Sequence, residues 1–508
     1  MKEIKEMDSA RLARGSAYLI TQSVATTIIG TATLAFIARA LTQVEMGVTV
    51  ALTLILDMAQ VLSDLGFSSG LTKYVAEYRG KEVDYTFMSF GAVLIKGFIS
   101  GFAAVLCVLT APWLSGFLLK SDEYVFLFQL LSIYLFTLCL STTMNYLLLG
   151  VNRIREMAIL NIIMVFVGKM SSVGFLMFGF GLVGLVVGWT LGGLAYAILG
   201  FLILMRNKYV RIHQIGEVVP YLKTLARFSW PLFLTNIALL FYNWFDRAFL
   251  FAFVSLSEVA VYSVAIKAFS VLSVVSIALS TTLFPYYSEK HGKDEQQRIM
   301  EGIHGSSRYI ALLYTPLALG LTATAGSVMR VFAGPAYAGG DIVLAILCLF
   351  GGINGLAASF GGLLLVFNMT PTVLLINVAS IAGSMMMSPV LLPLLGVVGM
   401  AIIRGVAMIV CLLLTIFAVR KRIPIKVDGE AIWKSWSAAF VMFGVVWFVE
   451  RIHFSPYLLP LYIVVGTIVY FVALRCLRVV NENDVELIRN FFGKRATVIM
   501  NLVERFFV

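Results

Sequence analysis

RFSWPLFLTNIALLFYNWFDRAFLFAFVSLSEVAVYSVAIK, residues 227–267, is apolar enough for two membrane-spanning helices, yet it carries a stripe of polar and charged residues. At about 100° per residue, Asn236, Asn243, Asp246 and Arg247 fall within roughly 100° of arc on one helix face. A charge that faces lipid at mid-membrane costs about 2.5–3.5 kcal/mol. We therefore expect the stripe to face a helix bundle or a watery cavity.

The composition extends this interpretation to the whole chain. Of 508 residues, 60% are hydrophobic and only 13% are charged, a balance typical of a polytopic membrane protein. Apolar runs long enough to span a bilayer occur at about fourteen places. They are 15–38, 45–68, 87–110, 124–149, 156–178, 182–205, 229–252, 258–284, 306–330, 340–366, 370–394, 396–419, 433–450 and 456–476.

The distribution of basic residues predicts the orientation of the chain. The net charge of +11 suggests nucleic acid as a partner, but most Lys and Arg lie in the amino terminus, the carboxy tail and every second loop. That asymmetry is the positive-inside pattern, with the basic face against the anionic inner leaflet. We expect a multi-pass protein of a prokaryotic cytoplasmic membrane, with both termini in the cytoplasm and no nucleic-acid partner.

An internal repeat appears when the sequence is shifted by 213 residues. Arg14 then falls on Arg227, and Glu45 falls on Glu258. With small added offsets, LLLGVN (147–152) meets LLLVFN (363–368), and GLVG (181–184) meets GVVG (396–399). Each repeat holds six predicted helices, an even number, so both enter from the same side as parallel repeats with a central site at their interface.

The repeat gives the expected organisation of this all-α membrane protein. We predict an N-lobe at 1–205, a cytoplasmic linker at 206–228, a C-lobe at 229–420, and a second linker with two extra helices at 421–476. The remainder, 477–508, alternates apolar and basic residues, which is typical of an amphipathic helix on the inner membrane surface. A cytosolic packing helix is the alternative for this tail.

The charges inside predicted spans are the candidate site residues. The cations Lys96, Lys169, Arg247, Lys267 and Arg404 outnumber the deep carboxylates Asp57 and Asp246. Such an excess attracts phosphates and repels cationic drugs. Lys267 has the least compensation nearby and is the strongest candidate for an anionic headgroup. Lys96 and Lys169 could instead extend to an interface, and Asp246 beside Arg247 could be a self-neutralising pair.

Polar groups on the second span complete the candidate set. Asp57, Gln60 and Asp64 form a stripe at spacings of three and four, and we expect Asp64 to lie at the watery cytoplasmic end. With Asn236 and Asn243, Asp57 and Gln60 are candidates for lining a polar cavity, and Asp57 or Asp246 for coupling to a proton or sodium gradient. The five cysteines lie singly in apolar runs and the histidines lack ligand spacing, so we expect no metal, no cofactor and no catalytic centre.

Two stretches carry a family resemblance. ARALTQVEMGVTVALTLILDMAQVLSDLGFSSGLTKYVAEY (38–78) and FDRAFLFAFVSLSEVAVYSVAIK (245–267) resemble the polysaccharide-biosynthesis branch of the multidrug/oligosaccharidyl-lipid/polysaccharide superfamily, in which Asp-Arg precedes a Glu/Gly turn. The G-x-x-x-D-R-x-G-R signature of the major facilitators is absent. The resemblance covers essentially the whole chain, through loose motifs.

The resemblance implies a flippase, not an enzyme, that moves a polyprenyl phosphate- or pyrophosphate-linked oligosaccharide for surface polysaccharide or glycan assembly. Alternating access of the two lobes would move this lipid across the membrane. We expect the protein to work as a monomer among membrane lipids. Polysaccharide assembly enzymes are further expected partners. A multidrug or organic cation exporter of the same superfamily is the first alternative, although it favours an acidic, aromatic cavity. A membrane glycosyltransferase is the second, but the predicted outer loops are short and lack a catalytic carboxylate motif.

Overall fold

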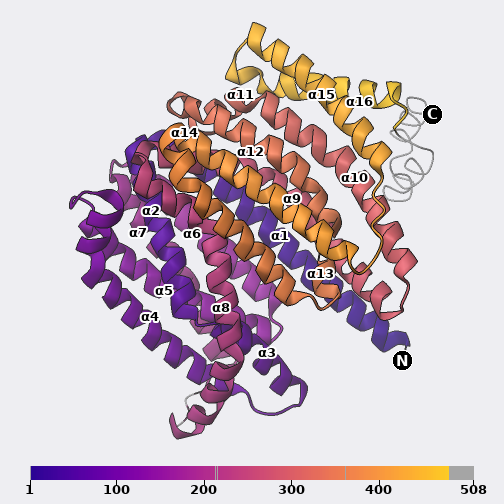
Figure 1. Ribbon diagram of the computed structural model, residues 1–508. Coiled ribbons are helices and arrows are strands. Elements are labelled where there is room, and N and C mark those ends of the chain that lie inside the picture. Colours follow the sequence, from indigo (N-terminus) through magenta and orange to yellow (C-terminus); the bar gives the residue numbers. More distant parts are fainter. Residues whose placement is uncertain (1, 212, 214, 361, 480–508) are drawn as a thin grey trace. The chain divides into compact units, whose positions relative to one another are not determined.

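The computed structural model describes residues 2–211, 213, 215–360 and 362–479, and these form helices with no strand among them (Figure 1). Residue contacts divide the chain into two compact units, Met1–Ala260 and Val261–Val508. The predicted all-helical membrane architecture is confirmed. The predicted domain boundaries stay a prediction, and the proposed tail helix lies outside the described residues from 480 onward.

The first unit is a bundle in which α4, α5 and α7 lie side by side and α6 packs along α7. Its helices are α1 (Lys2–Ala40), α2 (Gln43–Asp64), α3 (Phe67–Gly80), α4 (Thr86–Leu114), α5 (Val125–Gly150), α6 (Ile154–Met177), α7 (Gly181–Arg206) and α8 (Ile215–Phe253), with the π-helical turn η1 (Ser115–Leu119) after α4.

The second unit packs α10 against α12 and α15, and α15 against α16. Its elements are α9 (Leu256–Gly292), whose first turn belongs to the first unit, then α10 (Gln296–Ala323), α11 (Ala325–Ala333), η2 (Pro335–Gly340), α12 (Asp341–Asn354), η3 (Gly355–Phe360), α13 (Leu363–Val366), α14 (Thr370–Arg420), α15 (Gly429–Ile452), η4 (Pro456–Leu458) and α16 (Leu459–Cys476).

Equivalent helix boundaries and caps support the internal repeat. Both ends of α1 and α8 are related by the shift of 213 residues, as are the first residues of α2 and α9. Thr42 and Glu45 form a capping box at the start of α2, where the Thr42 backbone amide donates to Glu45 Oε2 at 2.8 Å. Ser255 and Glu258 repeat it at the start of α9, with a distance of 3.0 Å. Each box satisfies amide groups that a helix start leaves without a partner.

The number of spans depends on how broken helices are counted. Twelve described helices are long and apolar enough to cross a bilayer, and up to thirteen qualify if the bent pair α10 and α11 counts as one span. The 51 residues of α14 would reach about 75 Å, far beyond a hydrocarbon core of about 30 Å. Gly396, the first residue of the predicted span 396–419, breaks α14 with φ 54° and ψ −134° just after the predicted span 370–394. The count of fourteen stays a prediction.

Small residues allow α6 and α7 to pack closely. Gly184, Gly188 and Gly192 recur every four residues in α7, and all three are buried. A Cβ on Gly188 would lie 2.5 Å from the Ser172 backbone nitrogen, and one on Gly192 would lie 2.5 Å from the Met164 carbonyl oxygen. Since backbone atoms cannot move aside easily, these positions accept no side chain.

The substitution Gly188→Ala tests this packing. We expect it to lower the free energy of unfolding by about 1–3 kcal/mol, because the added methyl group forces α6 and α7 apart. Thermal unfolding of the detergent-solubilised protein measures the effect. Gly174→Ala on α6 is the matched control, since no atom lies within 4 Å of its Cβ position, and it should be neutral or slightly stabilising. Equal stability of wild type and Gly188→Ala would contradict the packing account.

An ion pair joins α10 to the start of α15 in the second unit. Arg308 Nη1 donates to Asp428 Oδ2 at 3.0 Å, and Asp428 Oδ1 accepts from the Ala431 backbone amide at 2.9 Å. Both charged side chains are nearly buried. Burial alone would raise the pKa of Asp428, but the hydrogen bonds from Ala431 and Arg308 and the positive charge of Arg308 together hold it below the usual 3.8.

Because the folded pKa of Asp428 is depressed, its stabilising contribution is present above pH 3.8 and is lost as the pH falls through the folded value. Asp428→Asn should therefore unfold at a lower temperature than wild type at pH 7, with the difference shrinking below about pH 4. Glu77→Gln, which breaks the exposed pair of Glu77 with Lys81, should leave the melting temperature unchanged. If the difference in unfolding temperature between Asp428→Asn and wild type were as large at pH 3 as at pH 7, the depressed pKa assigned to Asp428 would be contradicted.

Candidate functional site

A cavity of about 210 Å³ lies inside the first unit, where α2, α5, α6 and α7 meet. Asp57 of α2 and Lys169 of α6 both line it, so the fold brings together two charged residues predicted as site residues. Each is well inside its helix, about ten residues or fewer from the nearer end, which corresponds to a depth of about 10–15 Å. The cavity therefore lies within the apolar thickness of the bundle.

Aromatic rings also line the cavity. Trp189 of α7 and Tyr134 of α5 line it with ring centroids 5.9 Å apart and a tilt of 45°. Lys169 Nζ lies 6.0 Å from the Trp189 ring centroid, at the outer limit of a cation–π contact. Trp189 is only 8% exposed, and its Nε1 is buried without a hydrogen-bond partner among the described residues. The cavity thus combines a cation, a carboxylate, an indole donor and aromatic faces.

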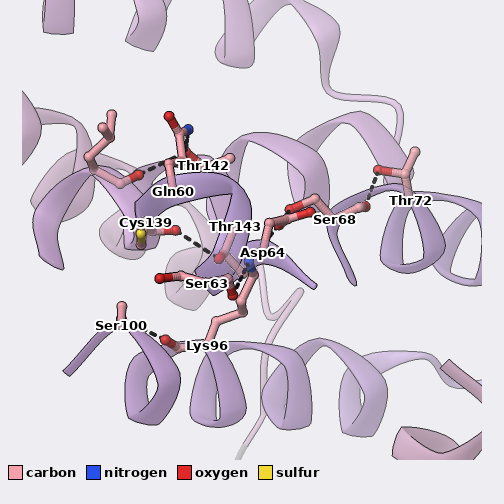
Figure 2. A network of polar contacts seen from close by, with 11 residues as sticks. Gln60, Ser63, Asp64, Ser68, Thr72, Lys96, Ser100, Cys139, Thr142 and Thr143 are labelled. Carbon is pink, nitrogen blue, oxygen red and sulfur yellow. Dashed lines mark hydrogen bonds and ion pairs between the residues drawn. The ribbon is translucent and has the colours of Figure 1, made fainter. Parts of the chain in front are cut away.

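A buried ion pair lies beyond the cavity, between α2 and α4. Figure 2 shows Lys96 of α4 extending to Asp64 at the end of α2, with Nζ 2.5 Å from Oδ1. The Lys96 ammonium also donates to the Ser63 carbonyl at 3.3 Å, and the Ser68 hydroxyl donates to Asp64. Lys96 is 3% exposed. Its charge is balanced locally, so it neither extends to an interface nor adds to the cation excess.

The pairing corrects the expectation for Asp64. Its side chain is 15% exposed and pairs with Lys96, so it is a mostly buried partner of that cation rather than a fully hydrated group. The spacing of Asp57, Gln60 and Asp64 indicated a shared stripe, but it could not identify Lys96 as the partner. Gln60 lies in the same network, where its Nε2 donates to Thr142 Oγ1 of α5 at 3.1 Å (Figure 2).

The polar stripe of α8 holds a buried carboxylate and a partly buried guanidinium. Asp246 is fully buried, and its Oδ1 accepts from the Arg247 backbone amide at 2.8 Å. The Arg247 guanidinium lies 4.2 Å from the Trp244 ring centroid, and its Nε is buried with no hydrogen-bond partner among the described residues. Asn236 is half-buried, whereas the side chain of Asn243 lies outside the described residues. Arg247 therefore retains donor capacity for an anion.

The second unit carries the two remaining predicted cations. Lys267 is exposed and lies 11 residues into α9, a rise of about 16 Å, in a segment whose mean hydropathy is 1.9. The Ser270 hydroxyl donates to the Lys267 carbonyl at 2.6 Å, and Val271, Val274 and Ile277 continue the exposed face. Arg404 is half-buried on α14. In the described part of the chain, no three His, Cys, Asp or Glu side chains are grouped for a metal ion.

Comparison with known proteins gives a family match and a fold match. A family model described as polysaccharide biosynthesis protein matches residues 12–291, more than half of the chain. The probable low-salt glycan biosynthesis flippase Agl15 of Haloferax volcanii is 24% identical over 224 residues. That alignment covers 44% of this chain and 48% of Agl15, so the chain spans about half the length of this curated relative.

Two solved structures share the fold. The lipid II flippase MurJ, in an inward closed conformation, superposes with a TM-score of 0.70 at 15% identity, covering 89% of this chain and 98% of that one. An inward-facing multidrug resistance transporter, described as a MATE family member of the MOP superfamily, superposes with a TM-score of 0.63 at 14% identity, covering 78% of this chain and 94% of that one. At these identities the likeness establishes the fold alone.

Proposed function

Because the chain belongs to the polysaccharide biosynthesis protein family, we propose that it is a flippase that moves a polyprenyl phosphate- or pyrophosphate-linked oligosaccharide across a membrane. The glycan biosynthesis flippase Agl15 and the lipid II flippase MurJ, whose sequence and fold it resembles, support this proposal. Their names describe flippases, which also supports a transporter rather than an enzyme.

The observation that carries the proposal is the exposed side chain of Lys267, about 16 Å along the apolar helix α9. Facing lipid, that charge would cost about 2.5–3.5 kcal/mol. A polar compartment that admits an anionic headgroup removes this cost. The exposed aliphatic face that follows, formed by Val271, Val274 and Ile277, suits a hydrocarbon chain attached to the same headgroup.

Arg247 and Arg404 are the other proposed headgroup ligands. Arg247 has a buried Nε without a hydrogen-bond partner in the described part of the chain, and a phosphate oxygen would satisfy it. Lys96 is better assigned to stability because Asp64 neutralises it. Lys169 shares its cavity with Asp57, so a net anionic ligand gains less there than at Lys267.

Reconstitution into proteoliposomes tests the proposal against its alternatives. We expect wild type to accelerate transbilayer movement of a pyrophosphate-linked oligosaccharide lipid in the absence of any sugar donor. Export of a cationic dye, with no movement of the lipid, would support the multidrug exporter that the second fold match suggests. Consumption of a sugar-nucleotide donor with elongation of the lipid-linked glycan would support a glycosyltransferase.

We also propose that a proton or sodium gradient drives this movement and that the two lobes work by alternating access. We place the protein, as a functional monomer, in a prokaryotic cytoplasmic membrane with both termini in the cytoplasm. Asp57 and Asp246 are carboxylates within membrane helices, and either can couple transport if its protonation or sodium binding differs between two states. Collapse of both the proton and sodium gradients with ionophores should slow net lipid movement several-fold. An unchanged rate of net movement would contradict coupling to an ion gradient. We also propose polysaccharide assembly enzymes as partners of the protein.

A further inference from the structure

We propose that the cavity between α2, α5, α6 and α7 binds one sugar ring of the glycan that the transported lipid carries. This inference rests on the proposed flippase function and adds to it a subsite for the carbohydrate. It concerns the residues that line this cavity in the first unit, so it does not depend on the cations of α8, α9 and α14 that we assign to the phosphate.

The unpaired indole of Trp189 is the first reason to expect a ligand. Its side chain is more than nine-tenths buried, it lines the cavity, and its Nε1 hydrogen has no acceptor in the described part of the chain. Leaving a buried donor without an acceptor costs about 1–3 kcal/mol, so an unpaired donor on a residue that lines a cavity points to an acceptor that a ligand can bring. A ligand hydroxyl would supply the missing acceptor once a small shift of the surrounding side chains lets it reach the buried Nε1.

The chemistry of the wall matches a sugar ring. A pyranose presents apolar C–H faces and an edge of hydroxyl groups that both donate and accept. Trp189 and Tyr134 supply aromatic faces against which a C–H face can pack. The Asp57 carboxylate accepts from hydroxyl groups and the Lys169 ammonium donates to them. The Thr53 hydroxyl donates to the Val50 carbonyl at 2.9 Å and can accept from a sugar hydroxyl. Donors, acceptors and flat apolar surface thus occur together in one cavity.

The size of the cavity favours a single ring over a larger ligand. Its volume of about 210 Å³ is below the roughly 300–1,000 Å³ of sites for drug-sized molecules. One pyranose can therefore enter, while an oligosaccharide or a bulky drug would have to leave most of its surface outside.

Binding to the full-length detergent-solubilised chain tests the subsite. The probes are polyprenyl pyrophosphate without sugar and the same lipid bearing one glucose, galactose, mannose or N-acetylglucosamine. We expect wild type to bind at least one glycosylated lipid more tightly than the bare lipid. Trp189→Phe, which removes the N–H and keeps an aromatic ring, should reduce that preference about five- to tenfold, the effect of one hydrogen bond, with unchanged affinity for the bare lipid.

Two further variants keep the test decisive. Tyr134→Leu removes the other ring and should reduce the same preference, even if Trp189→Phe does not fold. Trp113→Phe on α4 is the matched control, because Trp113 is 63% exposed and lies outside the cavity, and it should leave all affinities unchanged.

Several results would overturn the subsite. One is equal affinity of wild type for bare and glycosylated lipids. Another is an unchanged preference for the glycosylated lipid in both Trp189→Phe and Tyr134→Leu when these variants fold. A third is that these variants lose affinity equally for every lipid, bare or glycosylated. In each of these the bare lipid still binds, so the phosphate part of the proposed function survives. Failure of wild type to bind any of the lipids, bare or glycosylated, would instead reject the proposed function and the subsite with it.

Discussion

Replacing Lys267 with glutamate is expected to abolish transbilayer movement of a phosphate-linked glycolipid while the protein still folds and reaches the membrane. The side chain is exposed, so its reversal removes little packing. A charge-assisted hydrogen bond contributes about 1.5–3 kcal/mol, and the substituted carboxylate adds repulsion of the phosphate. The rate in proteoliposomes should therefore fall about a hundredfold or more.

Two substitutions separate charge from other effects at Lys267. Lys267→Arg keeps the positive charge and should retain most of the activity. Lys208→Glu reverses an exposed charge just after α7, outside the membrane helices, and should retain full activity. Full activity of Lys267→Glu, or an equal loss in Lys208→Glu, would rule out Lys267 as the headgroup ligand.

The second large effect is expected on stability, from the buried pair of Lys96 and Asp64. Lys96→Met leaves the Asp64 carboxylate, 15% exposed, without its cation. Removal of one partner of a buried ion pair typically costs about 3–5 kcal/mol, so we expect Lys96→Met to unfold at a much lower temperature than wild type. Thermal unfolding in detergent measures this loss.

A double-mutant cycle identifies the cause of that loss. Lys96→Met combined with Asp64→Asn removes both charges, and the double variant should be more stable than Lys96→Met alone. If the pair is structural, as its burial indicates, the double variant should also transport lipid once folded. If the stability loss of the double variant equalled the sum of the losses of Lys96→Met alone and Asp64→Asn alone, the two side chains would not interact. Loss of transport in a stably folded double variant would assign Lys96 to the substrate.

The sequence predicted the features of the fold that depend on local chemistry. Apolar runs predicted most of the helices, and the shift of 213 residues predicted equivalent elements that the matching boundaries of α1 and α8 support. The four-residue spacing of Gly184, Gly188 and Gly192 is typical of close helix packing, and Ser172 and Met164 of α6 do approach Gly188 and Gly192 closely. Periodicity, small-residue spacing and caps act within one or two helices, so they are visible in the order of residues.

The sequence could not predict features that need three or more helices at once. Asp57 and Lys169 were predicted separately, but nothing indicated that Trp189 and Tyr134 would join them in one cavity. An aromatic residue on an apolar helix has the same pattern whether it faces lipid or a cavity. The pairing of Lys96 with Asp64 was equally hidden, because the two lie 32 residues apart on different helices.

The central claim is that cations in the membrane helices recognise a lipid-linked phosphate. The most direct test compares two lipids in the same wild-type proteoliposomes, one with an oligosaccharide on polyprenyl pyrophosphate and one with the same oligosaccharide joined to the polyprenyl chain without phosphate. The account predicts rapid movement of the first and, at most, background movement of the second. Equal rates for the two lipids would show that phosphate recognition is not what selects the substrate.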